Sequence, residues 1–458
     1  MLYQALRSAA GVALRWYYSD VMIQGHEYVP ARGPVLIVAN HPNALVDALL
    51  VVTSVHRRVL LTAKATLFEH PLLAPILGAV GVVPLRRAKD ERTAAREGVA
   101  VSRNADAFRM VTEALRLERA VLVFPEGISH DAPSLAPLKT GAARMALEAQ
   151  RAGVRAMRVL PVGLVYEEKE TPRSRVLVRI GDSIDIDTWC AEHPTADAAL
   201  LTGEINARLH RVTLNFASAE RAERAVRVAR ALAALAEEPP SLAHGGTFVS
   251  EAEIAARVEA ATEGLENAPT ALVDATDAFT TRLAALETSL TERGAALADA
   301  RISLRVRHGT RFVLRETAIS IVALPIAAVG RVTHWLPIRI VRSIAMRTAD
   351  NSSSRDQPAM RTIVLGLVIL SLWYGLLAML ITGWLGGVAA VVALVGIFAA
   401  AQIDLRLDDR LNLVLRRAKT YLALRRDPRL RAHVLEEVDA LLEQAIGLEQ
   451  ELTSVKRR

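Results

Sequence analysis

The sequence offers little from which a disulfide or a thiolate site could be built, because Cys190 is the single cysteine among 458 residues. One cysteine excludes an internal disulfide framework and any metal site made of several cysteines. Aromatic residues are also scarce, at 4% of the chain, and no module that reads nucleic acid is recognisable. We therefore expect no nucleic acid partner, no resident metal and no oxidising compartment, although the formal net charge is +7.

The N-terminal segment 1–20 lacks the long uncharged core and the small-residue cleavage site of a signal peptide. Its apolar residues, with Arg7 and Arg15 between them, instead predict a helix. Such a helix either lies in a membrane interface or packs on its own domain. Apolar residues make up 52% of the chain, and this share favours a protein that contacts a bilayer.

Short apolar runs alternate with helical stretches through the first half of the chain, and this alternation predicts an α/β domain over residues 1–217. We expect a mixed sheet flanked by helices. The predicted strands lie at 35–40, 59–63, 80–85, 120–127, 159–166 and 176–182, and the main helical stretches at 42–55, 90–118, 139–153 and 198–216.

The second half of the chain has a different composition. Residues 218–310 are rich in Ala, Glu and Arg and predict a helical insertion. Residues 363–381 and 385–401 carry no charge over 19 and 17 positions, so 362–402 predicts two transmembrane helices that form a hairpin. Segment 311–345 holds an apolar run too short to span and interrupted by Pro325, which predicts an interfacial or re-entrant segment. The tail 403–458 predicts a cytoplasmic amphipathic helix.

Arginines flank the predicted hairpin on both sides. The positive-inside rule therefore places both of its ends in the cytoplasm. We expect a multi-pass membrane protein whose α/β domain lies on the cytoplasmic face. These arginines are Arg355 and Arg361 before the hairpin and Arg406, Arg410, Arg416 and Arg417 after it.

One candidate for acid–base chemistry is the segment NHPNALVD, residues 40–47, where a strand leads into a helix. An imidazole at a strand end can take a proton from an attacking hydroxyl, and a carboxylate at its other nitrogen stabilises the imidazolium. His41 and Asp47 are six positions apart and would not share one face of a helix. They can meet if His41 lies off the helix and Asp47 points back from it. Taken alone, an exposed histidine and a capping aspartate explain this pair as well.

Three further segments follow in order: GVVPLRR (81–87), FPEGIS (124–129) and LPVG (160–163). Together with NHPNALVD they resemble the four blocks of the phospholipid/glycerol acyltransferase family, across about residues 20–185. That family usually has four residues between the histidine and the aspartate. This chain has five, which resembles a subgroup of glycerol-phosphate-type acyltransferases. The family continues FPEG with threonine and arginine, whereas Ile128 and Ser129 stand there in this chain.

The resemblance implies roles for further residues. Arg87, or its neighbour Arg86, would hold the phosphate of the acceptor, and guanidinium suits phosphate through its planar donors. Glu126 would accept hydrogen bonds from glycerol hydroxyls or hold its loop through backbone amides, and Gly127 would allow close approach of a ligand. Lys64 and Lys139 match family positions for phosphate or for the acyl donor, and each is also explained as a surface lysine. His130 is read as a solvated loop residue.

The resemblance implies an O-acyltransferase of phospholipid synthesis. His41, oriented by Asp47, would act as the general base on a hydroxyl of glycerol 3-phosphate, dihydroxyacetone phosphate or lysophosphatidate. The acyl donor would be acyl-CoA or acyl-carrier protein, with no cofactor and no metal. Two alternatives stay open: an inactive membrane-anchored scaffold or tether, and a hydrolase of acyl thioesters or lysophospholipids.

Overall fold

The computed structural model describes residues 2–65, 68, 78, 82–85, 105–195, 197–236, 245–265, 268–302, 304, 306–349 and 357–457. The chain divides into two compact units, one of residues 1–215 with 346–364 and one of residues 216–345 with 365–458. The predicted boundary at 217 lies close to the first division, and the five predicted segments otherwise stay a prediction.

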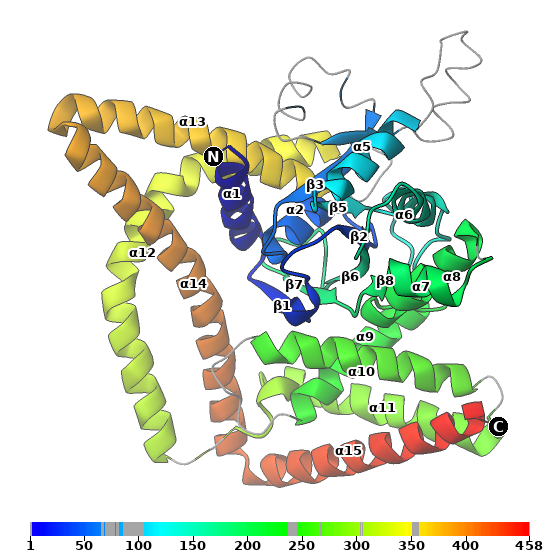
Figure 1. Cartoon of the computed structure of the whole chain (residues 1–458). Coiled ribbons are helices and arrows are strands. Elements are labelled where there is room, and N and C mark those ends of the chain that lie inside the picture. The colour runs from blue at the N-terminus through cyan, green and yellow to red at the C-terminus, as the bar shows by residue number, and fades with distance from the viewer. Residues whose placement is uncertain are drawn as a thin grey trace. The chain divides into compact units, whose positions relative to one another are not determined.

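The first unit is built on one mixed sheet (Figure 1), in the order β1-β7-β6-β2-β5-β3-β4, with β8 paired to β6. β2 pairs in parallel with β5 and β6, whereas β7 and β8 run antiparallel to β6. The predicted mixed α/β fold is therefore confirmed. The strands are β1 (Asp20–Gln24), β2 (Val35–Ala39), β3 (Val59–Lys64), β4 (Val83–Leu85), β5 (Ala120–Val123), β6 (Arg158–Tyr166), β7 (Arg175–Ile180) and β8 (Ile184–Asp185).

Helices cover the sheet, and the central strands β2 and β5 are buried along their whole length. A strand buried on both faces reads as a continuous run of β-branched and aliphatic residues, as these do. The helices of this unit are α1 (Leu2–Tyr17), α2 (Ala44–Ser54), α5 (Ala105–Arg116), α6 (Gly141–Arg151), α7 (Ile186–Glu192) and α8 (Ala198–Val212), with a short 3-10 turn η1 (His26–Tyr28).

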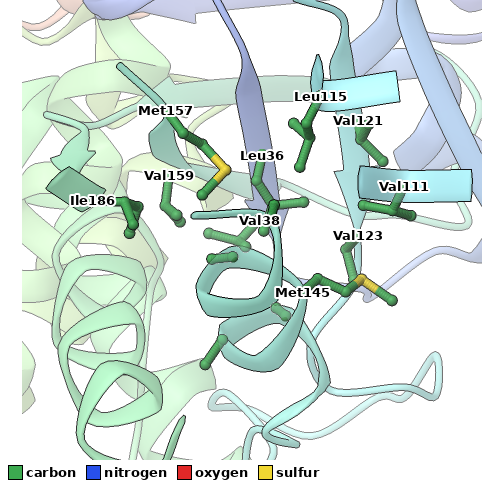
Figure 2. Close-up of a cluster of buried hydrophobic side chains, with 14 of the residues drawn as sticks. Leu36, Val38, Val111, Leu115, Val121, Val123, Met145, Met157, Val159 and Ile186 are labelled. Carbon is green, nitrogen blue, oxygen red and sulfur yellow. The ribbon is translucent and has the colours of Figure 1, made fainter. Parts of the chain in front are cut away.

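The main core lies between the sheet and α5, α6 and α8 (Figure 2). Each side chain of this size contributes roughly 1.5–3 kcal/mol to the stability of the fold when it is fully buried. This cluster therefore holds the sheet rigid. Gly163 of β6 lies so close to the backbone of Val212 that a Cβ there would collide with it. Core residues drawn in Figure 2 include Leu36, Val38, Val111, Leu115, Val121, Val123, Met145, Met157, Val159 and Ile186.

Helix α1 packs on α2 through one face, with Ala10, Leu14 and Tyr17 buried. Arg7 donates from its guanidinium to the carbonyl of Val55 at 2.8 Å, which ties α1 to the end of α2. Of the two interpretations of segment 1–20, packing on its own domain is therefore the one that applies to the buried face of α1. Leu2, Leu6 and Val12 remain exposed on the other face.

The second unit is helical. A cluster of buried side chains from α9, α11 and α15 forms its core, and α10 packs on α9 and α15. The helices are α9 (Ala219–Ala236), α10 (Gly245–Gly264), α11 (Thr270–Glu292), α12 (Val306–Ala349), α13 (Gln357–Leu385), α14 (Gly387–Arg426) and α15 (Pro428–Arg457), with a 3-10 turn η4 (Leu297–Asp299). The ends of α12 and α13 at 346–364 belong to the first unit.

Helix α12 contains the predicted segment 311–345 as one continuous helix of 44 residues that includes Pro325 and Pro337, whereas the interfacial or re-entrant location of this segment stays a prediction. A proline removes one backbone hydrogen bond and can kink a helix, but the hydrogen bonds of the turns on either side can keep the helix continuous. The stretch Thr310–Ala345 is long and apolar enough to cross a membrane, as are Pro358–Leu385 and Gly387–Arg426. The two predicted membrane helices correspond to α13 and α14, and α14 continues well past residue 402.

Candidate active site

His41 lies at the carboxyl end of β2, at the centre of the sheet. Asn40, the residue before it, is anchored to β6: its Oδ1 accepts from the amide of Leu164 at 2.7 Å and its Nδ2 donates to the carbonyl of Leu164 at 3.0 Å. β5 is parallel to β2, so the loop after Val123 leaves the sheet at the same edge. This arrangement brings the segments NHPNALVD and FPEGIS together.

The side chains of His41 and Asp47 form a hydrogen-bonded pair, with 2.9 Å between Nδ1 and Oδ2. Asp47 lies in the first turn of α2 and is fully buried. A carboxylate can only accept, so Nδ1 carries a proton and Nε2 presents its lone pair. No described residue hydrogen-bonds to Nε2. Burial raises the pKa of Asp47 above its ordinary value, and the hydrogen bonds from His41, Tyr166 and Asn43 act in the opposite direction.

A tight turn makes the six-position spacing workable. Ala44 adopts a left-handed conformation, with a φ of 45°, where the chain enters α2. The amide of Asn43 donates to Asp47 Oδ2 at 2.7 Å, and the amide of Ala44 donates to Ser129 Oγ at 3.0 Å. This turn, which Ser129 holds, accommodates the fifth residue between His41 and Asp47, where the family usually has four. The two places where this chain departs from the family pattern therefore meet in space.

The FPEG loop positions the imidazole from the other side. The ring of Phe124 stacks on the ring of His41, with 3.9 Å between centroids and 12° between planes. Glu126 is buried, and its Oε1 accepts from the amide of His41 at 2.7 Å while its Oε2 accepts from the amide of Ala136 at 2.9 Å. Of the two roles that the resemblance leaves open for Glu126, these contacts fit the holding of the loop through backbone amides.

His130 lies in the site, although the sequence interpretation treats it as solvated. Its side chain is 17% exposed, and its Nε2 contacts Glu126 Oε2. Its Nδ1 accepts from the amide of Ala132 at 3.1 Å, so the Nε2–H form donates to Glu126. Both ring nitrogens are engaged, whereas Nε2 of His41 has no partner in the described part of the chain. His130 therefore positions Glu126, and His41 is the imidazole open to a substrate.

Gly127 and Lys139 lie together beside this loop. Gly127 has a φ of 72°, and a Cβ at that position would collide with the side chain of Lys139, whose Nζ lies over the glycine. The amide of Lys139 donates to the carbonyl of Pro125 at 2.8 Å, which keeps the lysine at the loop. Its side chain is exposed, so the ammonium group is available on the open side.

The remaining predicted site residues are not placed. Arg86 and Arg87 lie outside the described residues, and the backbone of Lys64 ends β3 while its side chain lies outside the described part. The structure thus brings together His41, Asp47, Glu126, Gly127 and Lys139, and the phosphate contact expected of Arg87 or Arg86 stays a prediction. Among the described residues no cluster of three or more His, Cys, Asp or Glu side chains is arranged to hold a metal ion.

Tyr166, which the sequence patterns do not single out, completes the site. It ends β6, and its Oη donates to Asp47 Oδ1. Burial raises the pKa of Tyr166 well above its ordinary value, so the hydroxyl keeps its proton and serves as a donor. A tyrosine at the end of a strand next to one of the four blocks is the only sequence signal, and it is a weak one.

Replacing Tyr166 with phenylalanine is expected to lower kcat by about tenfold at neutral pH, because a hydrogen bond to a charged group contributes roughly 1.5–3 kcal/mol. Loss of this donor should also raise the pKa of Asp47 further and move the acidic limb of the kcat profile to higher pH. The control is Tyr17→Phe, which removes a hydroxyl that donates to the carbonyl of Glu170, away from the pair. An unshifted profile in Tyr166→Phe would leave Tyr166 with a packing role alone.

Comparison with known proteins agrees with the four blocks. The family model described as Acyltransferase matches residues 20–165. "Glycerol-3-phosphate O-acyltransferase 2" of Saccharomyces cerevisiae is 37% identical over 117 residues, which is 24% of this chain and 16% of that protein. "Glycerol-3-phosphate O-acyltransferase 1" of the same yeast is 38% identical over 81 residues, 17% of this chain and 10% of that protein.

Among solved structures, the crystal structure of the 1-acyl-sn-glycerophosphate (LPA) acyltransferase, PlsC, from Thermotoga maritima matches with 20% sequence identity and a TM-score of 0.35. The match covers 46% of this chain and 78% of that one. The chain spans less than a fifth of the length of either yeast relative, so the likeness concerns the domain that carries the site. Residues 20–165, which contain His41, Asp47 and the FPEG loop, are therefore the part of this chain that is similar to the acyltransferase family.

Proposed function

We propose that this protein transfers a fatty acyl chain from an acyl thioester to a hydroxyl of a glycerol-phosphate-type acceptor, with His41 as the general base. The observation that carries the proposal is the His41–Asp47 pair, in which Nδ1 is held at 2.9 Å by a buried carboxylate and Nε2 is open. A second observation supports it: the base lies at the edge of the sheet where the FPEG loop can hold a ligand.

In the proposed reaction, Nε2 of His41 takes the proton of the acceptor hydroxyl as that oxygen attacks the thioester carbonyl. The C–S bond breaks as the tetrahedral intermediate collapses, and the imidazolium returns its proton to the leaving thiolate. Asp47 stabilises the imidazolium between these steps. Positioning of the two substrates supplies much of the remaining acceleration. No covalent enzyme intermediate is required.

For the acceptor we propose glycerol 3-phosphate first, with dihydroxyacetone phosphate and lysophosphatidate as the alternatives. The two yeast relatives carry the name glycerol-3-phosphate O-acyltransferase, which favours the first. The donor would be acyl-CoA or acyl-carrier protein. Lys139 is an exposed cation beside Gly127 and would contact a phosphate of either substrate. Arg87 or Arg86 would hold the acceptor phosphate.

We propose that the reaction takes place at the cytoplasmic face of a membrane. The described part of the chain contains three helices long and apolar enough to cross a bilayer, and arginines flank the apolar runs of α13 and α14. A product with a long acyl chain can pass from such a site directly into lipid.

The proposal is tested by an acceptor screen on the purified protein in lipid nanodiscs, with product detection by mass spectrometry. Glycerol 3-phosphate, dihydroxyacetone phosphate and lysophosphatidate are each combined with acyl-CoA or with acyl-carrier protein, for the wild type and for His41→Ala. We expect one acceptor to give an acylated product that His41→Ala does not form. Release of free fatty acid regardless of acceptor would instead identify a hydrolase, and no product with any pair would favour a scaffold.

A further inference from the structure

The three long apolar helices α12, α13 and α14 are equal candidates for crossing a bilayer when only length and composition are considered. We propose that α13 and α14 cross it as a hairpin, and that α12 lies along the membrane surface, in contact with lipid headgroups. This surface is on the same side as the bundle of α9, α10, α11 and α15. The proposal concerns lipid contact and does not depend on the acyl-transfer reaction.

The first support is the number of crossings. Helix α15 follows α14 and packs on α11, which precedes α12, in one buried core that includes Leu283, Leu290, Val438 and Leu441. The start of α12 and the end of α14 therefore join the same body. Three crossings would place these two ends on opposite faces of the bilayer, so the number of crossings must be even. Ion pairs also tie α15 to this body: Arg257–Glu449, Arg282–Glu437 and Arg301–Asp439.

The second support excludes α12 as one of the crossing helices. Its charge-free stretch 317–330 is bounded by Glu316 and Arg331. Glu316 pairs with Arg410 at 2.6 Å and Arg331 with Asp404 at 2.9 Å. A crossing by this stretch would put Arg410 and Asp404 on opposite faces, yet they lie only about 9 Å apart along α14 at a helical rise of about 1.5 Å per residue. Both ends of the stretch are therefore on the same face.

The length of the stretch 317–330 also argues against a crossing by α12. Fourteen residues extend about 21 Å as a helix, which is less than the roughly 30 Å thickness of a hydrocarbon core. The part of α12 that follows carries the exposed arginines Arg339 and Arg342, so it offers no second charge-free stretch of spanning length. Gly330 lies against the backbone of Ala400, where a Cβ would collide, and this close approach fixes where α12 meets α14.

The hairpin of α13 and α14 offers longer uncharged helices than α12 does. No charged residue lies between Thr362 and Ile403, and Gly386 makes the turn between the two helices with a φ of 81°. As helices, the uncharged part of α13 (362–385) extends about 36 Å and that of α14 (387–403) about 26 Å, compared with about 21 Å for 317–330. Trp384 at this turn is 91% exposed, and tryptophan at the end of a span suits the headgroup region of the far face.

Helix α12 carries an arginine–aromatic pair, in which Arg339 lies over the ring of Trp335 at 5.3 Å. Such a pair is typical of the boundary between headgroups and acyl chains. Helix α12 also contacts α13 within the uncharged run 363–381: Trp373 donates from its indole to the carbonyl of Thr333 at 3.0 Å, and Tyr374 Oη lies 2.9 Å from His334 Nε2. Exposed apolar side chains of α12, which include Ile321, Val322, Leu324, Val329 and Val332, would enter the acyl region.

The topology is tested by single-cysteine labelling of the full chain in a Cys190→Ser background, in which no other thiol reacts. A membrane-impermeant maleimide is applied to sealed vesicles and again after permeabilisation. We expect Arg311→Cys and Arg342→Cys, near the two ends of α12, to react from the same side as Glu253→Cys in α10 and Glu436→Cys in α15. Trp384→Cys should react only from the opposite side.

A measurement of depth in the bilayer then distinguishes an α12 that lies in the membrane surface from an α12 that makes no contact with lipid. A fluorophore on Leu324→Cys should be quenched more by a nitroxide near the lipid headgroup than by one at the bilayer centre, and Val395→Cys in α14 should show the reverse. Labelling of Arg342→Cys from the side of Trp384→Cys would overturn the proposal. So would labelling of Trp384→Cys from the side of Glu436→Cys, or absence of lipid quenching at Leu324→Cys.

Discussion

Replacing His41 with alanine is expected to lower kcat by about 10²–10⁴-fold while the protein stays folded, because general base catalysis typically contributes that much. The imidazole is the only group whose proton-accepting nitrogen is open in the described part of the site, so no neighbour can substitute for it. His130 cannot, since both of its ring nitrogens are engaged. The measurement is the steady-state rate of acyl transfer to the acceptor found in the screen, in nanodiscs.

The matched control is His26→Ala, which removes an exposed imidazole in η1 that pairs with Glu27. It should keep the wild-type rate, and both variants should show the melting temperature of the wild type. A His41→Ala protein with the fold intact and near-normal turnover would exclude His41 as the base. If His41→Ala loses both its activity and its fold, the same rate is measured for His41→Gln, because glutamine keeps a polar side chain of similar length but has no basic nitrogen.

Replacing Asp47 with asparagine should lower kcat by about 10²–10⁴-fold as well, because the imidazolium loses its counter-charge and the neutral imidazole loses the acceptor that sets its tautomer. Asparagine keeps the shape of the side chain, so the turn at Asn43 and Ala44 should persist. The control is Asp106→Asn, an exposed carboxylate on α5. Turnover of Asp47→Asn within a few-fold of the wild type would show that the carboxylate does not assist the base.

The same variant has a second expected effect, on stability. Burial raises the pKa of Asp47 in the folded state above its ordinary value, so the folded state binds this proton more tightly than the unfolded state does. The stability that this group contributes is therefore present at low pH and is lost as the pH rises through the raised pKa. Relative to Asp47→Asn, the melting temperature of the wild type should fall as the pH rises above about 4. A rise over that range would mean that the hydrogen bonds to Asp47 outweigh its burial.

These predictions describe a site in which the candidate catalytic pair, His41 and Asp47, is held by several neighbouring groups. Phe124 stacks on the imidazole, Glu126 fixes its backbone, and Tyr166 and Asn43 donate to the carboxylate. Such packing and hydrogen bonding restrict the rotamers of the reacting side chains, which is what precise positioning of a base requires. Within the FPEG segment, Phe124 and Glu126 therefore support the imidazole.

The sequence by itself determined which residues are candidates for the chemistry and that two of their segments follow buried strands. Asn40-His41 and Phe124-Pro125-Glu126 each follow a buried apolar run, and the ends of parallel strands converge, so their meeting was predictable from strand order. The uncharged lengths of 363–381 and 385–401 predicted two helices that could span a membrane, since a span needs about 20 apolar residues, and α12 is a third such candidate that the structure adds. Both inferences rest on local composition.

Only the tertiary structure decided the partners of those residues. Tyr166 and His130 became part of the site through hydrogen bonds to Asp47 and Glu126, and nothing in their own neighbourhoods in the sequence specifies such contacts. The left-handed turn at Ala44, held by Ser129 from 85 positions away, likewise depends on two loops meeting. The ion pair of Arg331 with Asp404 joins residues 73 positions apart. Composition sets what a segment can bury, whereas the position of a hydrogen-bond or charge partner depends on how distant segments pack.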